Sequence, residues 1–294
     1  MGLTLTHEQS VPISPAVHRI LVEKTDFAYA KLRLDHLIDP SIDQKAITRT
    51  IDGMAATIAA MAGPRASATR KVGMLRHYLY DPGPWNDNRP FRYDLADPCG
   101  KKIENKLLAT YLRTRLGNCV SMPVLFAILA DRLGADVTLS TAPLHVFVKM
   151  TDETGRVIDI EATDHGYPVK DEFYRRKLAI SDKAVASGIY LAKLSRAESV
   201  ALITDTVVEC LMKRGRYAEA VDVAAAILQH YPRNIDAIVQ QASAYGYMLK
   251  AEFEDRYSNP NAIPPELRPR YEMLVAKNRK AFETAEGLGW TPTT

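Results

Sequence analysis

Apolar residues near the amino terminus recur at helical spacing. After Pro15, apolar side chains return to one face at near-helical intervals until Pro40 ends the pattern. We predict a first helix here, which could be interrupted near Thr25. The residues that carry this pattern are Ile20, Leu21, Phe27, Leu32 and Leu37.

Two further helices are predicted before a polar connection. One begins at Ser41, where Ser41 and Gln44 have the spacing of a capping box, and ends at Gly63-Pro64. The other runs from Ser67 to about Tyr80 and carries an apolar stripe. The next segment, 81–100, is too rich in Pro, Gly, Asp and Asn for regular structure, so we expect a long surface connection.

The hydrophobic pattern changes again in the middle of the chain. Residues 105–116 predict a helix, and residues 122–133 are apolar nearly all round from Met122 to Ala130, which is typical of a buried helix. After Gly134 the hydrophobic period falls to two, which predicts strands. They are expected at 136–140, 144–150 and 156–163, the last two joined by a glycine-containing turn.

The last third of the chain is predicted to be helical from about Arg196. Residues 215–234 resemble the second half of a tetratricopeptide repeat. One such unit is fewer than the three or so that a free-standing solenoid needs, so we expect these helices to lean on the preceding domain. The residues at the packing offsets are Tyr217, Ala220, Ala224, Ile227 and Pro232.

Together these elements predict an α+β fold in three regions. The chain has 294 residues, enough for a sizeable core without disulfides or metals. The predicted regions are a helical N-terminal region (1–66), a core in which a buried helix packs on an antiparallel sheet (67–195), and a helical C-terminal region (196–294).

Composition and motif content disfavour nucleic acid, a membrane and a cofactor as partners of this chain. A formal net charge of +3 gives no strongly basic face, which disfavours nucleic acid. The opening residues have neither the basic nor the apolar segment of a signal peptide, and no apolar run is long enough to span a membrane, so we expect a soluble, cytoplasmic protein. Neither a phosphate-binding glycine motif nor a metal-ligand motif occurs, so no cofactor or metal is implied.

Cys119 is the cysteine with the most informative position. It lies between a Gly-Asn turn signal and the buried helix, where the positive end of the helix would favour a thiolate. Either Ser121 or Asn118 could cap that helix. Ser121 is the easier cap, because Pro123 then falls in the first turn, whereas a helix capped by Asn118 would lose an internal hydrogen bond.

His145 is the candidate base, and two acidic residues on the next strand are candidates to orient it. In an antiparallel hairpin, residues directly opposite each other point to the same face. If the turn is symmetric about Glu153, His145 faces Glu161, and if the turn is centred one residue earlier, it faces Asp159. Both registers put a carboxylate beside the imidazole, which is the logic of a catalytic triad.

The backbone N–H of Cys119 is the natural donor to a tetrahedral oxyanion, assisted by a loop group or by Asn118.

The other candidate catalytic residues are weaker because they lack partners. Cys99 is a loop thiol, Cys210 sits on a helical stripe and is expected in the core, and His165 is expected in a turn.

The joint order of these features resembles the transglutaminase-like superfamily, a variant of the papain-type cysteine fold. The matching segments are GNCVSMPVLFAILADRLG (117–134), HVFVK (145–149) and IDIEAT (158–163) followed by Asp164-His165-Gly166. With its helical lead-in and tetratricopeptide-like tail, the whole chain looks like the SirB1-like branch. Glu161 stands where the family usually has Asp, and Phe147 where many relatives have Trp.

By this resemblance the triad falls on Cys119, His145 and Glu161, with Asp159 as the alternative acid. It implies a cofactor-free thiol hydrolase or acyltransferase that acts on an amide or related acyl bond of a peptide or protein. The rival hypothesis is a transglutaminase-like module that binds a peptide or protein partner. The enzyme needs an accessible cysteine of low pKa in contact with His145, whereas the module tolerates a buried, neutral one.

Overall fold

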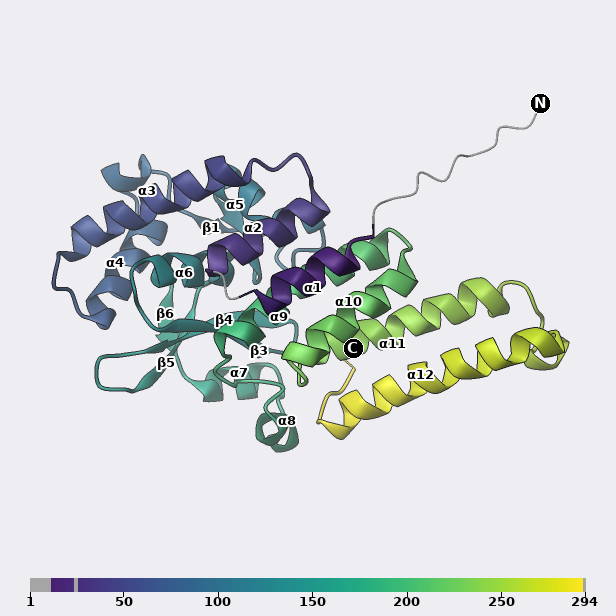
Figure 1. Ribbon diagram of the computed structural model, residues 1–294. Coiled ribbons are helices and arrows are strands. Elements are labelled where there is room, and N and C mark those ends of the chain that lie inside the picture. Colours follow the sequence, from purple (N-terminus) through teal and green to yellow (C-terminus); the bar gives the residue numbers. More distant parts are fainter. Residues whose placement is uncertain (1–11, 24–25, 293–294) are drawn as a thin grey trace, which may run out of the picture.

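The structure is a computed structural model that describes residues 12–23 and 26–292. It has the α+β class that the sequence predicts, with a small antiparallel sheet among many helices (Figure 1). The break expected near Thr25 lies at residues outside the described ranges. Helices occupy both sides of it, and the N-terminal ones are α1 (Ser14–Val22), α2 (Phe27–Ile38), α3 (Gln44–Ala62) and α4 (Ala68–Tyr80).

The capping residues of these helices explain where they begin. Ser67, where the predicted helix begins, is the cap of α4, because its side chain accepts a hydrogen bond from the N–H of Arg70. The capping box predicted at Ser41 is wrong: Asp43 caps α3 instead, while the Ser41 hydroxyl donates to Asp39. A carboxylate directly before the first turn also complements the helix dipole, so Asp43 is the better cap.

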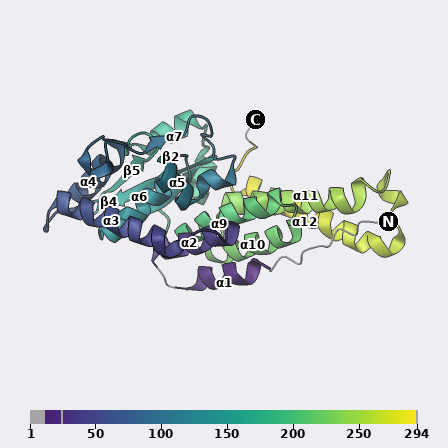
Figure 2. The same cartoon turned by 90° about the horizontal axis from the view of Figure 1, so that it is seen from above.

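Helix α6 (Ser121–Arg132) occupies the centre of the core, as its apolar sequence predicts. Ten consecutive residues from Ser121 to Ala130 are buried. The sheet contacts one side of α6, and α2, α3, α4 and α5 contact its other sides (Figure 2). The segment before α6 contains η1 (Pro84–Asn86), β1 (Arg92–Tyr93), η2 (Ile103–Lys106), α5 (Leu108–Thr114) and β2 (Leu116–Gly117).

The main sheet has four antiparallel strands in sequential order. They are β3 (Val137–Ala142), β4 (His145–Thr151), β5 (Val157–Glu161) and β6 (Tyr167–Val169). The first three follow the predicted strands, and β6 was not predicted because Pro168 and its short length hide it. After β6 come two short helices, α7 (Asp171–Lys177) and α8 (Asp182–Ser187).

The register of β4 and β5 differs from both predicted registers. Val148 lies opposite Ile160 and Lys149 opposite Asp159, so the hairpin is centred on Thr154, one residue beyond Glu153. Continuing this register puts Glu161 opposite Phe147 and not opposite His145. His145 and Glu161 still share a face, because the side chains of a strand alternate with a period of two and diagonal neighbours remain within reach.

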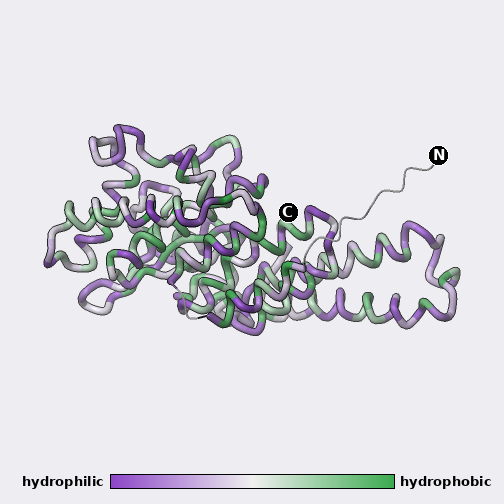
Figure 3. The backbone as a smooth tube through the Cα atoms, turned by 45° about the horizontal axis from the view of Figure 1, so that its top comes forward, coloured by the Kyte–Doolittle hydropathy of each residue, from purple (hydrophilic) through white to green (hydrophobic). Residues whose placement is uncertain are grey.

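Four long helices complete the chain, and α11 and α12 extend away from the sheet as an arm (Figure 1). Apolar segments are concentrated where the helices and the sheet meet, while the arm alternates between polar and apolar residues (Figure 3). One cluster of buried apolar side chains runs from Ile13 through α6 to Ala244, so the C-terminal helices lean on the core as expected. The four helices are α9 (Arg196–Lys213), α10 (Tyr217–His230), α11 (Ile235–Leu249) and α12 (Arg268–Gly287), and three short elements, η3 (Lys250–Glu254), η4 (Pro260–Ala262) and η5 (Pro265–Leu267), join α11 to α12.

A buried ion pair ties the N-terminal helices to the segment that leads to Cys119. Lys31 on α2 donates to Asp35 at 2.6 Å and to the carbonyl of Lys106 at 3.1 Å. The other oxygen of Asp35 accepts from the N–H of Leu108 at 2.9 Å. A buried pair whose remaining groups are hydrogen-bonded fixes geometry, because removing either partner would leave an uncompensated charge. The end of η2 is therefore held rigidly on α2.

Candidate functional site

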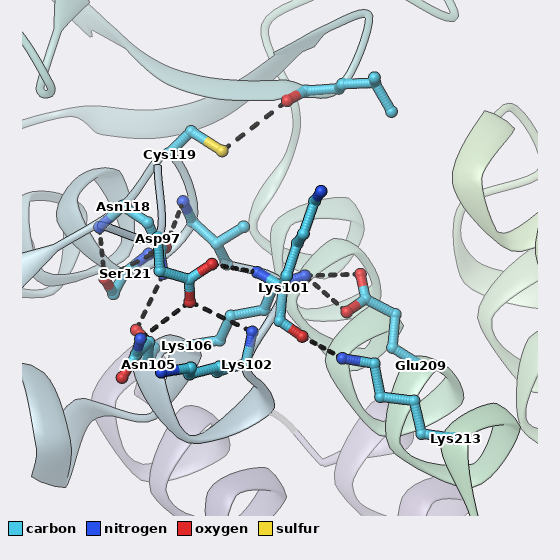
Figure 4. A network of polar contacts seen from close by, with 12 residues as sticks. Asp97, Lys101, Lys102, Asn105, Lys106, Asn118, Cys119, Ser121, Glu209 and Lys213 are labelled. Atoms are coloured by element: carbon cyan, nitrogen blue, oxygen red, sulfur yellow. Dashed lines mark hydrogen bonds and ion pairs between the residues drawn. The ribbon is translucent and has the colours of Figure 1, made fainter. Parts of the chain in front are cut away.

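Asn118 supplies the capping interactions just before α6 (Figure 4). Its side-chain oxygen accepts hydrogen bonds from the N–H groups of Val120 and Ser121, both at 3.0 Å. The preference for Ser121 as cap was therefore wrong, and its hydroxyl instead accepts from the N–H of Asn118 at 3.1 Å. Pro123 still offers no N–H to the Cys119 carbonyl, which is the hydrogen bond that this arrangement gives up.

The Cys119 thiol is buried, with 5% of the residue exposed. Its sulfur donates to the carbonyl of Leu144 at 3.7 Å, which places it at the entry to β4, one residue from His145 (Figure 4). Burial raises the pKa of Cys119 to about 11, although the charge of Lys106 and the N–H of Cys119 itself favour the thiolate. The helix start therefore does not lower the pKa as expected, because loss of water outweighs it.

His145 and Glu161 form a close pair, with Nε2 of His145 2.7 Å from Oε2 of Glu161. The side chains are 18% and 7% exposed, so the pair lies at the edge of the core. With Nε2 held by the carboxylate, the neutral ring carries its lone pair on Nδ1. No hydrogen bond joins the His145 ring to the thiol within the described ranges.

Glu161 accepts four hydrogen bonds. Its Oε2 also accepts from the hydroxyl of Tyr174 at 2.7 Å, and its Oε1 accepts from the N–H and hydroxyl of Thr163 at 2.9 and 2.6 Å. Burial acts to raise the pKa of Glu161, but bonding to His145, Thr163 and Tyr174 outweighs it and lowers the pKa to about 2. The residue is a carboxylate at neutral pH, as a group that orients an imidazole must be.

Tyr174 is a site residue that sequence reasoning missed. It comes from the short helix α7 and is stacked on Phe147, with ring centroids 4.3 Å apart. Its ring also lies 5.8 Å from the imidazole of His145. Nothing in the local pattern of residues 171–177 marks it, because its role depends on α7 returning to the sheet. Burial raises its pKa, so it remains a phenol and a hydrogen-bond donor.

Asp159, the alternative acid, is engaged elsewhere. It lies opposite Lys149 in the sheet, and Nζ of Lys149 is 2.5 Å from its Oδ1 and 3.0 Å from Oδ1 of Asp171. Burial and the neighbouring Asp171 raise the pKa of Asp159 to about 6, against the opposing effect of Lys149. The structure therefore brings Glu161, and not Asp159, to the imidazole.

The backbone around Cys119 leaves one donor available. No oxygen of another described residue accepts a hydrogen bond from the N–H of Cys119. The amide of Asn118, by contrast, donates to the carbonyl of Asn105 at 3.0 Å. Gly100 packs so closely behind this amide that a Cβ there would meet Asn118 Nδ2 at 2.7 Å and Lys106 Cε at 2.8 Å. The side chain of Asn118 is thus fixed as part of the support.

The weaker candidates lie where the sequence suggests. Cys99 is exposed in the loop, and Cys210 is buried on α9, as predicted for a core residue. His165 is exposed in the turn before β6, with a positive φ of 54°. All three cysteines are free thiols.

Comparison with known proteins identifies the family. The model of the transglutaminase-like superfamily matches residues 45–203, more than half of the chain, and the match contains Cys119, His145 and Glu161. No curated protein and no solved structure matches the chain. In the part of the chain that the structure describes, no helix has the length and apolar character to cross a membrane. The extent of the family match shows that the chain belongs to the transglutaminase-like superfamily.

Proposed function

We propose that the protein is a cysteine-dependent hydrolase or acyltransferase that acts on an amide or related acyl bond. Cys119 is the nucleophile, His145 the general base and acid, and Glu161 the orienting carboxylate. The observation that carries this proposal is the His145–Glu161 pair, in which a fully hydrogen-bonded carboxylate holds Nε2 and leaves Nδ1 to accept a proton.

The resting thiol is neutral, so the proposed reaction uses His145 as a base during attack and not a preformed ion pair. The thiol turns from the Leu144 carbonyl towards Nδ1 and transfers its proton, while sulfur bonds to the acyl carbon. The developing oxyanion is stabilised by the N–H of Cys119. Collapse breaks the bond to the leaving amine, which takes the proton from His145.

The acyl-enzyme is then resolved by water or by a second amine. That nucleophile loses its proton to His145 as it attacks, and the thiolate leaves and recovers the proton. Hydrolysis and transfer use the same three residues, so the site supports both. Glu161 stays ionised throughout because it stabilises the imidazolium that forms at each step.

A second candidate function is supported by the state of the thiol. The burial of Cys119, its raised pKa and its bond to Leu144 suit a structural cysteine in a module that binds a peptide or protein. In that case the His145–Glu161 pair would serve only to hold β4 and β5 together.

Acylation by p-nitrophenyl acetate at neutral pH separates these two functions, with adducts located by peptide mass spectrometry. Cys99 is exposed and provides an internal control. An enzyme acylates Cys119 faster than Cys99, and His145→Ala removes that advantage without changing Cys99. Acylation of Cys99 alone, or of Cys119 at a rate that His145→Ala leaves unaltered, would establish the binding module.

The narrower features belong to the same proposal. We assign the chain to the SirB1-like branch, with tetratricopeptide-like helices in the C-terminal region, and with the boundaries 1–66, 67–195 and 196–294. The consecutive packing of α9, α10 and α11 through short connections supports the repeat-like region. A cytoplasmic, reducing setting agrees with three unpaired cysteines, and a peptide or protein is the expected substrate or partner.

A further inference from the structure

A small cavity lies behind the candidate site, between the core and the C-terminal helices. Its volume is about 60 Å³. This volume is several times the ~10–15 Å³ that one water molecule needs. The cavity therefore has room for a compact polar group and part of a methylene chain. Apolar side chains from α6 and the residue before it, and from β3, β4 and α9, form its walls, namely Val120, Val124, Leu139, Val146, Leu202 and Ile203.

The cavity is also lined by side chains that carry oxygen acceptors. Asp205 and Glu209 come from α9, and Asp236 and Gln240 come from α11. These four residues lie beyond the segment that matches the family. Lys106 is the cation among the lining residues, and both of its short contacts, at 2.7 and 2.5 Å, go to Glu209 (Figure 4). Glu209 is thereby neutralised, whereas Asp205 and Asp236 share no salt bridge with a described residue.

Two of these acceptors are buried and unpartnered. Asp205 is 7% exposed, and its Oδ2 accepts from Asn234 at 2.8 Å, but its Oδ1 has no hydrogen-bond partner among the described residues. Oε1 of Gln240 also lacks one in the same part of the chain. Buried polar atoms are rarely left unpaired, because the loss of water costs about 1–3 kcal/mol for each group.

We propose that this cavity is a binding site for an alkylammonium group on an unbranched methylene stem. An ammonium has three donors and no acceptor, which matches Asp205 Oδ1, the Asp236 carboxyl and Gln240 Oε1. The apolar walls suit the methylene stem, and Asp205 and Asp236 supply the opposite charge. A lysine side chain has this chemistry, whereas a guanidinium is broader and a peptide α-ammonium is attached to a branched carbon.

Burial and the neighbouring acids raise the pKa of Asp205 and of Asp236 by more than the charge of Lys106 lowers it. Burial, then the charge of Asp236, raises the pKa of Asp205. Burial, then the charge of Glu209, raises the pKa of Asp236 to about 6. A bound cation would offset these effects. A metal ion fits less well, since no group of three or more His, Cys, Asp or Glu in the described ranges could hold one.

Calorimetric titration of the full chain with n-butylammonium tests the site, with 1-butanol as the uncharged probe of equal length. No acyl donor is present, so the result does not depend on the proposed catalysis. We expect saturable binding of n-butylammonium that weakens at least about tenfold in Asp205→Asn and in Asp236→Asn, and none of 1-butanol. Asp222→Asn, an exposed acid on α10, is the matched control and should bind as the parent does.

Gln240→Met keeps the charges and removes one acceptor, so it should also weaken the binding of n-butylammonium. This variant tests the site even if Asp205→Asn fails to fold. The site is disproved if the parent shows no saturation up to about 20 mM, if 1-butanol binds equally, or if Asp236→Asn and Gln240→Met bind as the parent does. An equal loss of affinity for n-butylammonium in Asp222→Asn would show that general charge attraction, and not this site, accounts for the binding. Tighter binding of n-propylguanidinium or alaninamide would overturn the assigned ligand class.

Discussion

The hydroxyl of Tyr174 lies 2.7 Å from Oε2 of Glu161, the same oxygen that Nε2 of His145 contacts. Tyr174 of α7 thus fixes the carboxylate of Glu161, which in turn orients the imidazole of His145. Because a hydrogen bond to a charged group contributes about 1.5–3 kcal/mol, this contact matters for both stability and geometry.

Tyr174→Phe should keep the stacking on Phe147 and lose only that hydrogen bond. We expect the free energy of unfolding to fall by about 1–3 kcal/mol and the acylation rate of Cys119 to fall by about tenfold. Urea unfolding and the p-nitrophenyl acetate assay measure the two effects. Tyr167→Phe, which changes an exposed tyrosine, is the control, and equal behaviour of the two variants would remove Tyr174 from the site.

Glu161→Gln should change how stability depends on pH. The pKa of Glu161 is lowered from 4.5 to about 2, so its carboxylate stabilises the fold above about pH 4.5, and this contribution is lost as the pH falls towards 2. The shift corresponds to roughly 3 kcal/mol. Unfolding free energies of parent and variant should therefore differ most at neutral pH and converge near pH 2.

The exposed Glu172→Gln variant is the control for this experiment. Its difference from the parent should show no comparable dependence between pH 4.5 and pH 2. A Glu161→Gln difference that stays constant over this window would show that the carboxylate is not held by the contacts described.

Asp159→Asn should destabilise the protein without disabling the candidate site. It leaves the buried Lys149 with the partly exposed Asp171 as its carboxylate partner, so we expect a loss of about 3 kcal/mol, as for other broken buried pairs. The acylation of Cys119 should remain within about twofold of the parent, measured under conditions where the variant is folded. Loss of acylation in Asp159→Asn but not in Glu161→Gln would reverse the roles of the two acids.

Gly100→Ala should disturb the support of Cys119. The added Cβ would crowd Asn118 and Lys106, and φ is +61°, so a destabilisation of about 1–3 kcal/mol is expected. Gly155→Ala is the matched control, because Gly155 has φ +85° but open space around its Cβ position. Thermal unfolding should show the larger loss at Gly100, and equal losses would mean that backbone strain alone is responsible.

Alkylation of Cys119 by iodoacetamide should be slow at neutral pH. Since burial raises the pKa of this thiol to about 11, its thiolate fraction and its labelling rate should keep rising as the pH approaches 11. The exposed Cys99 should label faster at pH 7. Peptide mass spectrometry follows both sites, and rapid labelling of Cys119 below pH 7 would show a preformed thiolate instead.

Local sequence determined the longer helices and the first three strands of the main sheet, and together with the family resemblance it named the candidate triad. Helix α6 is apolar on nearly every side, which can only be satisfied in the centre of a core, so the position of Cys119 at its start follows. His145 and Glu161 share a face although both predicted registers were wrong. A strand alternates with a period of two, and the diagonal neighbour in the observed register is still within reach.

Only the tertiary structure decided the interactions that depend on segments distant in sequence. Lys149 draws Asp159 away from the imidazole, and Tyr174 returns on α7 to hold Glu161. Burial raises the pKa of Cys119, because the surrounding elements exclude water from the thiol. This effect outweighs the favourable position of Cys119 at the start of α6, which the sequence alone predicts. Long-range partners, and the degree to which they exclude water from one side chain, leave no periodic trace in the chain, and these are what distinguish a reactive thiol from a structural one.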